Sequence, residues 1–186
     1  PEPAVSWNVS GTLAVAENSA VDSDTNDANQ TERRANNDFP TAQPLVTPFL
    51  LLGTVNQPGA GAAGANQAAG DVLDGYRVSL QPGQVVELEF SGDPAQNDLD
   101  LYVYDETATG EAPPPIGESV GLGPYECVRI TRAGQHYIAV TAYQGASSYQ
   151  LRVGAPSETS SCVNAASSLS GMVPGQVVAK PKTGAE

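Results

Sequence analysis

Residues 97–105, NDLDLYVYD, constrain the fold more than any other part of the chain. Leucine and valine at every second position alternate with aspartate and tyrosine. This alternation predicts a half-buried β-strand, because successive side chains leave a strand on opposite faces. We expect the apolar side chains to face a core, and Asp98 and Asp100 to project together from the other face. Two neighbouring carboxylates repel each other unless a proton or a hard cation lies between them, so this strand is a candidate metal carrier.

Other parts of the chain repeat this pattern over short stretches. The segments predicted as strands are 5–15, 49–55, 76–80, 86–90, 125–131, 135–143 and 148–153. The pairs Pro82-Gly83, Ala133-Gly134 and Gly145-Ala146 separate neighbouring strands and predict β-hairpins. Short strands with frequent turn signals, together with 19 Gly and 15 Pro, favour an all-β fold. We predict an antiparallel, jelly-roll-like β-sandwich with extended N- and C-terminal arms.

The sequence divides into three parts. Residues 1–35 form an N-terminal arm that holds the strand 5–15 and an acidic turn. Residues 36–154 form the sandwich. Residues 155–186 form a Ser-rich linker and a strand-like C-terminal tail, whose apolar segment spans 172–180.

The charge of the chain limits its partners. The formal net charge is −13 at pH 7 and the pI is about 4.2. An acidic protein repels nucleic acid and anionic lipid surfaces and favours cations. No apolar run is long enough to span a bilayer. We therefore predict neither a nucleic-acid partner nor membrane insertion.

The two cysteines, Cys127 and Cys162, indicate the compartment. In a chain poor in Lys and rich in Gly, Asn, Ser and Thr, they predict one disulfide in an exported protein, because disulfides persist in oxidising compartments. Two unpaired buried thiols are the alternative. We expect an extracellular location and a targeting segment removed ahead of Pro1.

Two enzyme motifs match the chain but lack the context that they need. Residues 117–121, GESVG, fit the pattern around a hydrolase serine, here Ser119, but they follow three prolines and precede no predicted helix. The only histidine, His136, lies on a predicted strand. Residues 59–64, GAGAAG, fit a dinucleotide-binding pattern without the helix that should follow, and the Gly- and Ala-rich residues 59–70 predict a flexible loop. We predict that the protein is not an enzyme.

Carboxylates gather in three places, in oxygen-rich turns that suit Ca²⁺ better than Zn²⁺, which prefers His and Cys. Asp22, Asp24 and Asn26 match the first positions of an EF-hand loop, whose later Gly and Glu are missing. The other two clusters flank predicted strands. The candidate metal ligands are Asp22, Asp24, Asn26, Asp71, Asp74, Asp98 and Asp100. Solvated acids in turns are the alternative for each cluster alone. We predict Ca²⁺ at one cluster or more.

Tyrosine is the most frequent aromatic residue, with seven Tyr against three Phe and one Trp. Tyr102, Tyr104 and Tyr143 fall on predicted strands and are a candidate binding surface for a polysaccharide or a protein substrate. The alternative is that these rings pack at the sheet surface with a solvated hydroxyl.

In order along the chain, GDVLDGYRVSL, PGQVVELEF, NDLDLYVYD, AGQHYIAVTAY and GASSYQLRV resemble the bacterial pre-peptidase C-terminal domain. The resemblance covers about residues 36–154. Residues 9–27 resemble the segment that precedes this domain in some subtilisin-like serine proteases. Residues 172–180, MVPGQVVAK, are similar to the opening of the prodomain of such enzymes. The chain as a whole is therefore similar to the N-terminal propeptide region of a subtilisin-like protease.

The resemblance implies a small, non-catalytic antiparallel β-sandwich that often binds calcium, accompanies secreted proteases and is removed during maturation. It implies Asp71, Asp74, Asp98 and Asp100 as metal ligands. It also implies a protease domain in a precursor as a partner.

Two other hypotheses follow from the residues. The chain could be the subunit of an extracellular filament in which copies exchange strands through residues 5–15 or 172–180. It could instead be a module that binds polysaccharide or a protein substrate through its strand tyrosines.

Overall fold

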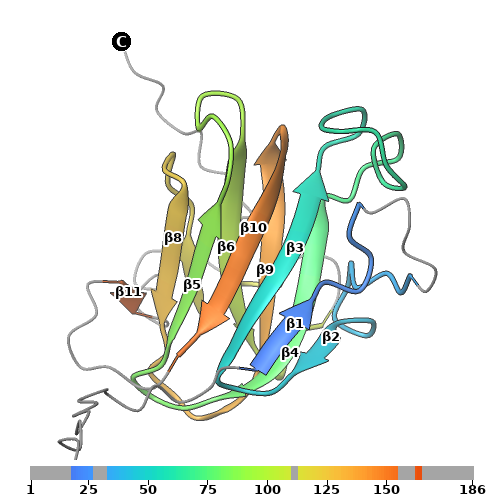
Figure 1. Ribbon diagram of the computed structural model, residues 1–186. Helices are drawn as coiled ribbons and strands as arrows, with labels where there is room; N and C mark the ends of the chain where they lie inside the picture. Colours follow the sequence, from blue (N-terminus) through green and yellow to red (C-terminus); the bar gives the residue numbers. More distant parts are fainter. Residues whose placement is uncertain (1–17, 27–32, 110–112, 155–161, 165–186) are drawn as a thin grey trace, which may run out of the picture.

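The computed structural model describes residues 18–26, 33–109, 113–154 and 162–164 (Figure 1). These residues form two β-sheets that pack face to face, which confirms the predicted all-β sandwich. Among them there is no helix that is long and apolar enough to cross a membrane. The predicted strand 5–15 and the tail 172–180 lie outside the described residues.

Both sheets are antiparallel in the centre and mixed at the edges. The strand order of the six-stranded sheet is β1 (Asn18–Val21), β3 (Phe49–Asn56), β10 (Ala146–Val153), β5 (Val85–Phe90), β8 (Tyr125–Arg129) and β11 (Val163–Asn164). The order of the five-stranded sheet is β2 (Gln43–Leu45), β4 (Leu73–Leu80), β9 (Gly134–Gln144), β6 (Asp98–Asp105) and β7 (Gly117–Ser119). The edge strands β1, β2 and β11 run parallel to their neighbours, so the sandwich is not purely antiparallel as predicted.

Alternation along the strands builds the core between the sheets. Leu99, Leu101 and Val103 of β6 are fully buried, as their spacing predicts. Phe49 and Leu51 of β3 join the same cluster from the other sheet. Each such side chain contributes about 1.5–3 kcal/mol when it leaves water, so the two inner faces together hold the layers in contact.

The three predicted hairpins are wrong, because at each of them the chain passes from one sheet to the other. β4 belongs to the five-stranded sheet and β5 to the six-stranded one, and the steps from β8 to β9 and from β9 to β10 also change sheets. Packed sheets lie about 10 Å apart, a gap that about three extended residues span. Gly83 and Gly145 have φ angles of 86° and 70°, which allow these sharp corners. Turn composition does not reveal in which layer the next strand lies.

Gln43 of β2 closes the side of the sandwich at β1. Its Nε2 donates to the carbonyl of Val21 at 3.0 Å, and its Oε1 accepts from the amide of Ser23 at 2.9 Å. Since β2 and β1 belong to different sheets, this one side chain joins the two layers. A strand added at this edge would have to displace Gln43.

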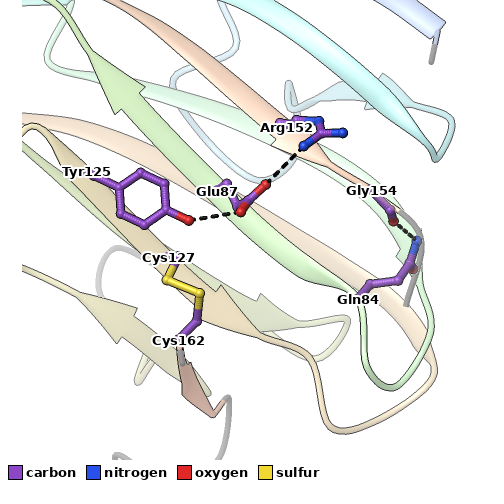
Figure 2. A network of polar contacts seen from close by, with 7 residues as sticks. All are labelled: Gln84, Glu87, Tyr125, Cys127, Arg152, Gly154 and Cys162. Carbon is purple, nitrogen blue, oxygen red and sulfur yellow. Dashed lines mark hydrogen bonds and ion pairs between the residues drawn. A yellow bond between two sulfur atoms is a disulfide. The ribbon is translucent and has the colours of Figure 1, made fainter. Parts of the chain in front are cut away.

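The predicted disulfide is present at the opposite edge of the six-stranded sheet (Figure 2). It joins Cys127 of β8 to Cys162, the residue before β11. On the outer face nearby, the Tyr125 hydroxyl donates to Glu87 at 2.8 Å, and Glu87 pairs with Arg152 at 3.6 Å. Exposed pairs of this kind contribute at most about 1 kcal/mol. The disulfide is therefore the principal fastening of this edge.

We expect the double variant Cys127→Ser/Cys162→Ser to be less stable than the wild type by about 2–4 kcal/mol. The two cysteines are 35 residues apart, and opening a loop of this length restores chain entropy to the unfolded state. Urea denaturation followed by circular dichroism measures the change in the free energy of unfolding. A change below about 0.5 kcal/mol would contradict the prediction.

Candidate metal centre

Four aspartates from two distant parts of the chain meet at one end of the sandwich. Asp22 and Asp24 directly follow β1, Asp71 precedes β4, and Asp74 lies in β4. One carboxylate oxygen of each lies within 4.8 Å of one oxygen of every other. All four residues are at most 5% exposed. The structure thus places four acidic groups in a single buried cluster.

Backbone hydrogen bonds hold the four residues in place. The amide of Asp22 continues the pairing of β1 by donating to the carbonyl of Leu52 at 2.9 Å. Asp71 and Asn56 exchange both of their backbone hydrogen bonds, at 2.8 and 2.9 Å, which ties the end of β3 to the start of β4. Asp74 is on the inner face of β4, two residues before the buried Tyr76. The cluster is therefore anchored to β1, β3 and β4 by backbone hydrogen bonds, with Asp24 in the turn after β1.

Buried hydroxyl groups connect the carboxylates to the core. The hydroxyl of Tyr76 and the Nδ2 of Asn36 donate to Oδ1 of Asp22 at 3.1 and 2.9 Å. The Tyr149 hydroxyl hydrogen-bonds with Oδ2 of Asp74 and with the Tyr76 hydroxyl. Tyr149 comes from β10 and Tyr76 from β4, so this chain of contacts crosses from one sheet to the other.

The remaining carboxylate oxygens have no such partners. Oδ2 of Asp22 and Oδ1 of Asp24, Asp71 and Asp74 are buried and accept no hydrogen bond. A buried polar atom without a partner costs about 1–3 kcal/mol, and more when the group is charged. Four unpartnered oxygens in one carboxylate cluster are an arrangement that a bound cation would satisfy.

The electrostatics of the cluster show the same need for positive charge. Burial, followed by the charge of Asp22, raises the pKa of Asp24 to about 6. Burial, followed by the charges of Asp24 and Asp22, raises the pKa of Asp71 to about 7. Burial also raises the pKa of Asp22, and it raises that of Asp74 well above the usual range. The positive charge of Arg33 lowers the pKa of Asp24 and of Asp71 in part. Its guanidinium donates to the backbone carbonyl of Asp24, at 2.9 Å, and not to the carboxylate of that residue.

Asn26, Asp98 and Asp100 are not members of this cluster. The side chain of Asn26 bonds to the loop that follows β3. It accepts from the backbone amide of Asn66 at 2.8 Å and donates to the carbonyl of Ala62 at 3.0 Å. Asp98 and Asp100 are buried at the start of β6, outside the group of four. Their role as metal ligands stays a prediction.

Sequence reasoning missed the residues that support the cluster. Asn36 and Tyr149 reach Asp22 and Asp74 through hydrogen bonds over 14 and 75 residues of chain. Asn66 donates its amide to Oδ2 of Asp71 from the Gly- and Ala-rich loop. Tyr149 falls on the predicted strand 148–153, but nothing local indicates that it is buried or which residue it bonds to.

The residues of the hydrolase-like motif do not form a catalytic pair. Ser119 of β7 lies opposite Leu101 on β6, whereas His136 of β9 lies opposite Asp105. Four residues of strand, about 13 Å, separate these two positions along β6. The Ser119 hydroxyl donates to the buried Glu126, and Nδ1 of His136 bonds to the carbonyl of Gly134 at 2.9 Å.

The predicted tyrosine surface divides into two parts. Tyr102 and Tyr104 are half-buried on the outer face of β6, with ring centroids 6.4 Å apart. Phe39 packs against Tyr104 and Tyr137 at 5.2 and 5.0 Å, which covers part of this surface. Tyr143 is 53% exposed and lies further along β9. Tyr104 therefore packs against another ring of the protein, as expected for the alternative of rings packed at the sheet surface.

No protein-family model and no curated protein matches this chain. Among solved structures, the pre-peptidase C-terminal domain of collagenase from Bacillus anthracis has a TM-score of 0.43 and 14% identity, over 60% of this chain and 93% of that one. PliG from Aeromonas hydrophila, a periplasmic inhibitor of g-type lysozyme, has a TM-score of 0.37 and 14% identity, over 60% and 96%. Neither similarity assigns a family, so the functional conclusion depends on the residues of the site.

Replacing Gly53 of β3 tests how tightly the tyrosine network is packed. A methyl group at this position would overlap the ring and hydroxyl of Tyr149, which lies on the facing position of β10. Because that hydroxyl is held by Asp74, we expect Gly53→Ala to lower the free energy of unfolding by about 1–3 kcal/mol in urea denaturation. Gly123→Ala is the matched control, since an added methyl there meets nothing within 4 Å. Equal effects of the two substitutions would contradict this packing.

The cluster also predicts an unusual dependence of stability on pH. The folded pKa values of Asp24 and Asp71, about 6 and 7, lie above the ordinary value of 3.8, so the folded state keeps protons that the unfolded state has lost. We expect the free energy of unfolding of metal-stripped protein to fall as the pH rises from about 4 to about 7. Urea denaturation across this range measures it. Asp71→Asn should flatten the profile, and a wild-type profile that rises with pH would contradict the prediction.

Proposed function

We propose that this protein is a non-catalytic, calcium-binding β-sandwich module that acts outside the cytoplasm. The observation that carries the proposal is the set of four buried, unpartnered oxygens on Asp22, Asp24, Asp71 and Asp74. A protein that buries four carboxylates together requires either protons or a cation between them. A cation supports the fold at neutral pH, where protons bind only in part.

The donor set favours calcium. All four groups are carboxylates, without the His nitrogen or Cys sulfur that zinc prefers. Calcium takes oxygen ligands at about 2.3–2.6 Å, so oxygens on opposite sides of the ion lie about 5 Å apart. The spread of up to 4.8 Å within the cluster is compatible with this distance. Magnesium requires a smaller shell and keeps several of its waters.

The disulfide and the charge support a location outside the cytoplasm. The Cys127–Cys162 bond persists in an oxidising compartment, where calcium is also more abundant than in the cytosol. The net charge of −13 keeps such a module soluble and away from anionic surfaces. The separation of Ser119 from His136 supports a binding or structural role and not a hydrolytic one.

The resemblance of residues 36–154 to the pre-peptidase C-terminal domain supports an accessory role. We extend the proposal to a module that accompanies a subtilisin-like protease in a precursor. Expression of residues 36–154 alone would remove Asp22 and Asp24, two of the four candidate ligands, so the functional unit includes the preceding arm.

Calcium titration by isothermal calorimetry tests the proposal. We expect wild-type protein to bind Ca²⁺, and Asp71→Asn and Asp74→Asn to bind at least about tenfold more weakly. Both variants should stay folded, because each relieves the repulsion within the cluster. At a concentration of about 100 times the dissociation constant, Ca²⁺ should stabilise the wild type by about 2.7 kcal/mol.

Asp100→Asn is the matched control for the calorimetry. Asp100 is as deeply buried as the cluster, but it lies outside the group of four and accepts from the Tyr102 hydroxyl at 3.3 Å. We expect it to leave the calcium affinity of the four-aspartate site unchanged, whereas a calcium site at Asp98 and Asp100 would be a separate binding event that only this variant loses. Absence of binding by the wild type at millimolar Ca²⁺, or an equal loss in Asp100→Asn and Asp74→Asn, would refute the proposed site.

A further inference from the structure

A groove of about 470 Å³ lies on the outer face of the six-stranded sheet, the face turned toward the viewer in Figure 1. Its lining comes from β1, β3, β10 and β5, together with Thr25 after β1 and Ser91 after β5. Two core residues of these strands, Phe90 and Tyr149, also belong to the lining of the groove, and the Tyr149 hydroxyl bonds to Asp74 of the carboxylate cluster. No role described so far uses this surface.

One wall of the groove is a row of four longer side chains. In the strand register Val21 lies beside Leu52, Leu52 beside Gln150, and Gln150 beside Glu89. Val21, on the edge strand β1, is 60% exposed, and Leu52 beside it on β3 is 50% exposed. The row therefore presents an apolar half, an amide and a carboxylate in a straight line across four strands.

The floor beside this wall is made of small hydroxyl side chains. Ser148 of β10 lies opposite Thr54 of β3, and the backbone of Ser91 donates to the carbonyl of Ser148 at 3.0 Å. These side chains are much shorter than Leu52 and Gln150 in the neighbouring row. The difference in length between the two rows is what hollows the face.

The polar atoms of the groove have spare hydrogen-bonding capacity. Within the described part of the chain, the side chains of Gln150, Ser148, Glu89 and Thr25 make no hydrogen bond to another residue, although all four line the groove. The backbone groups beneath them are paired within the sheet. An extended peptide that adds a strand needs a free sheet edge, whereas β3, β10 and β5 beneath the groove each have a paired strand on both sides.

A sugar chain matches what the groove presents. Its C–H faces would lie on Val21 and Leu52, and its hydroxyls would bond with the amide of Gln150, the carboxylate of Glu89 and the hydroxyl of Ser148. The carboxylate of Glu89 and the net charge of −13 oppose acidic polymers and suit the ammonium group of an amino sugar.

We propose that this groove binds an oligosaccharide, with preference for one that carries amino groups. The candidate calcium centre lies next to the wall of the groove, because Val21 precedes Asp22 and Thr25 follows Asp24. This part of the inference depends on the proposed function. Calcium at the cluster would hold both groove residues in position, so oligosaccharide binding is expected to weaken when calcium is withdrawn.

Three β-1,4-linked hexamers that differ only at carbon 2 test the inference: the hexamers of glucose, N-acetylglucosamine and glucosamine. Binding is measured by calorimetry on calcium-saturated full-length protein. We expect a dissociation constant of about 1 mM or tighter, with the glucosamine hexamer the tightest. Gln150→Ala should weaken all three at least about fivefold, and Glu89→Gln should remove the advantage of the glucosamine hexamer.

The controls decide between this face and its alternatives. Tyr143→Ala, on the other sheet, should bind as the wild type does, and a loss in this variant alone would move the site to the tyrosine surface and overturn the inference. Failure of all three hexamers on calcium-saturated protein, or binding of hexalysine in their place, would also overturn it. Calcium affinity is measured in a separate titration, so absence of calcium binding is distinguished from absence of oligosaccharide binding.

Discussion

Repulsion among four buried carboxylates is the constraint on which the rest of the structure depends. Asp22, Asp24, Asp71 and Asp74 come from two segments that are about 50 residues apart, and each keeps one oxygen without a hydrogen bond. Without positive charge between them, these groups would push the arm that carries β1 away from the start of β4. With a cation they do the reverse, since every ligand then gains by staying close. The same four residues can therefore either weaken or strengthen the attachment of the N-terminal arm.

The tyrosine pair explains how the cluster affects the core and not only the surface. Tyr76 and Tyr149 are buried among apolar side chains, and burial with nearby carboxylates raises the pKa of both phenols well above 10. They therefore stay protonated and act as donors to Asp22 and Asp74. Gly53 leaves the space through which the Tyr149 ring reaches from the six-stranded sheet to Asp74 of the other sheet. A change at the cluster is in this way transmitted to residues that hold the two layers together.

Local pattern predicted the strands well but not their partners. The alternation in β6 was sufficient to place Leu99 and Leu101 in the core, because burial on one face has a period of two residues. The assignment of hairpins failed because a short turn can join strands within one sheet or across two. For the candidate site, the sequence alone was sufficient to name Asp22, Asp24, Asp71 and Asp74 as candidate ligands. It was not sufficient to predict their convergence, since this depends on the parallel pairing of β1 with β3 and on Asn56 bridging to Asp71.

Each edge strand of the six-stranded sheet, β1 and β11, is held in place by a contact other than strand pairing. β1 has four residues and β11 has two, so neither forms enough backbone hydrogen bonds to stay in place by pairing alone. Each is fastened by a contact that is distant in sequence: β11 by the Cys127–Cys162 bond, and β1 by Gln43 and the carboxylate cluster. The disulfide requires an oxidising medium and the proposed calcium site requires millimolar to micromolar calcium. On the proposed function, an oxidising medium that contains calcium adds one contact at each edge, whereas the Gln43 hydrogen bonds hold β1 in any medium.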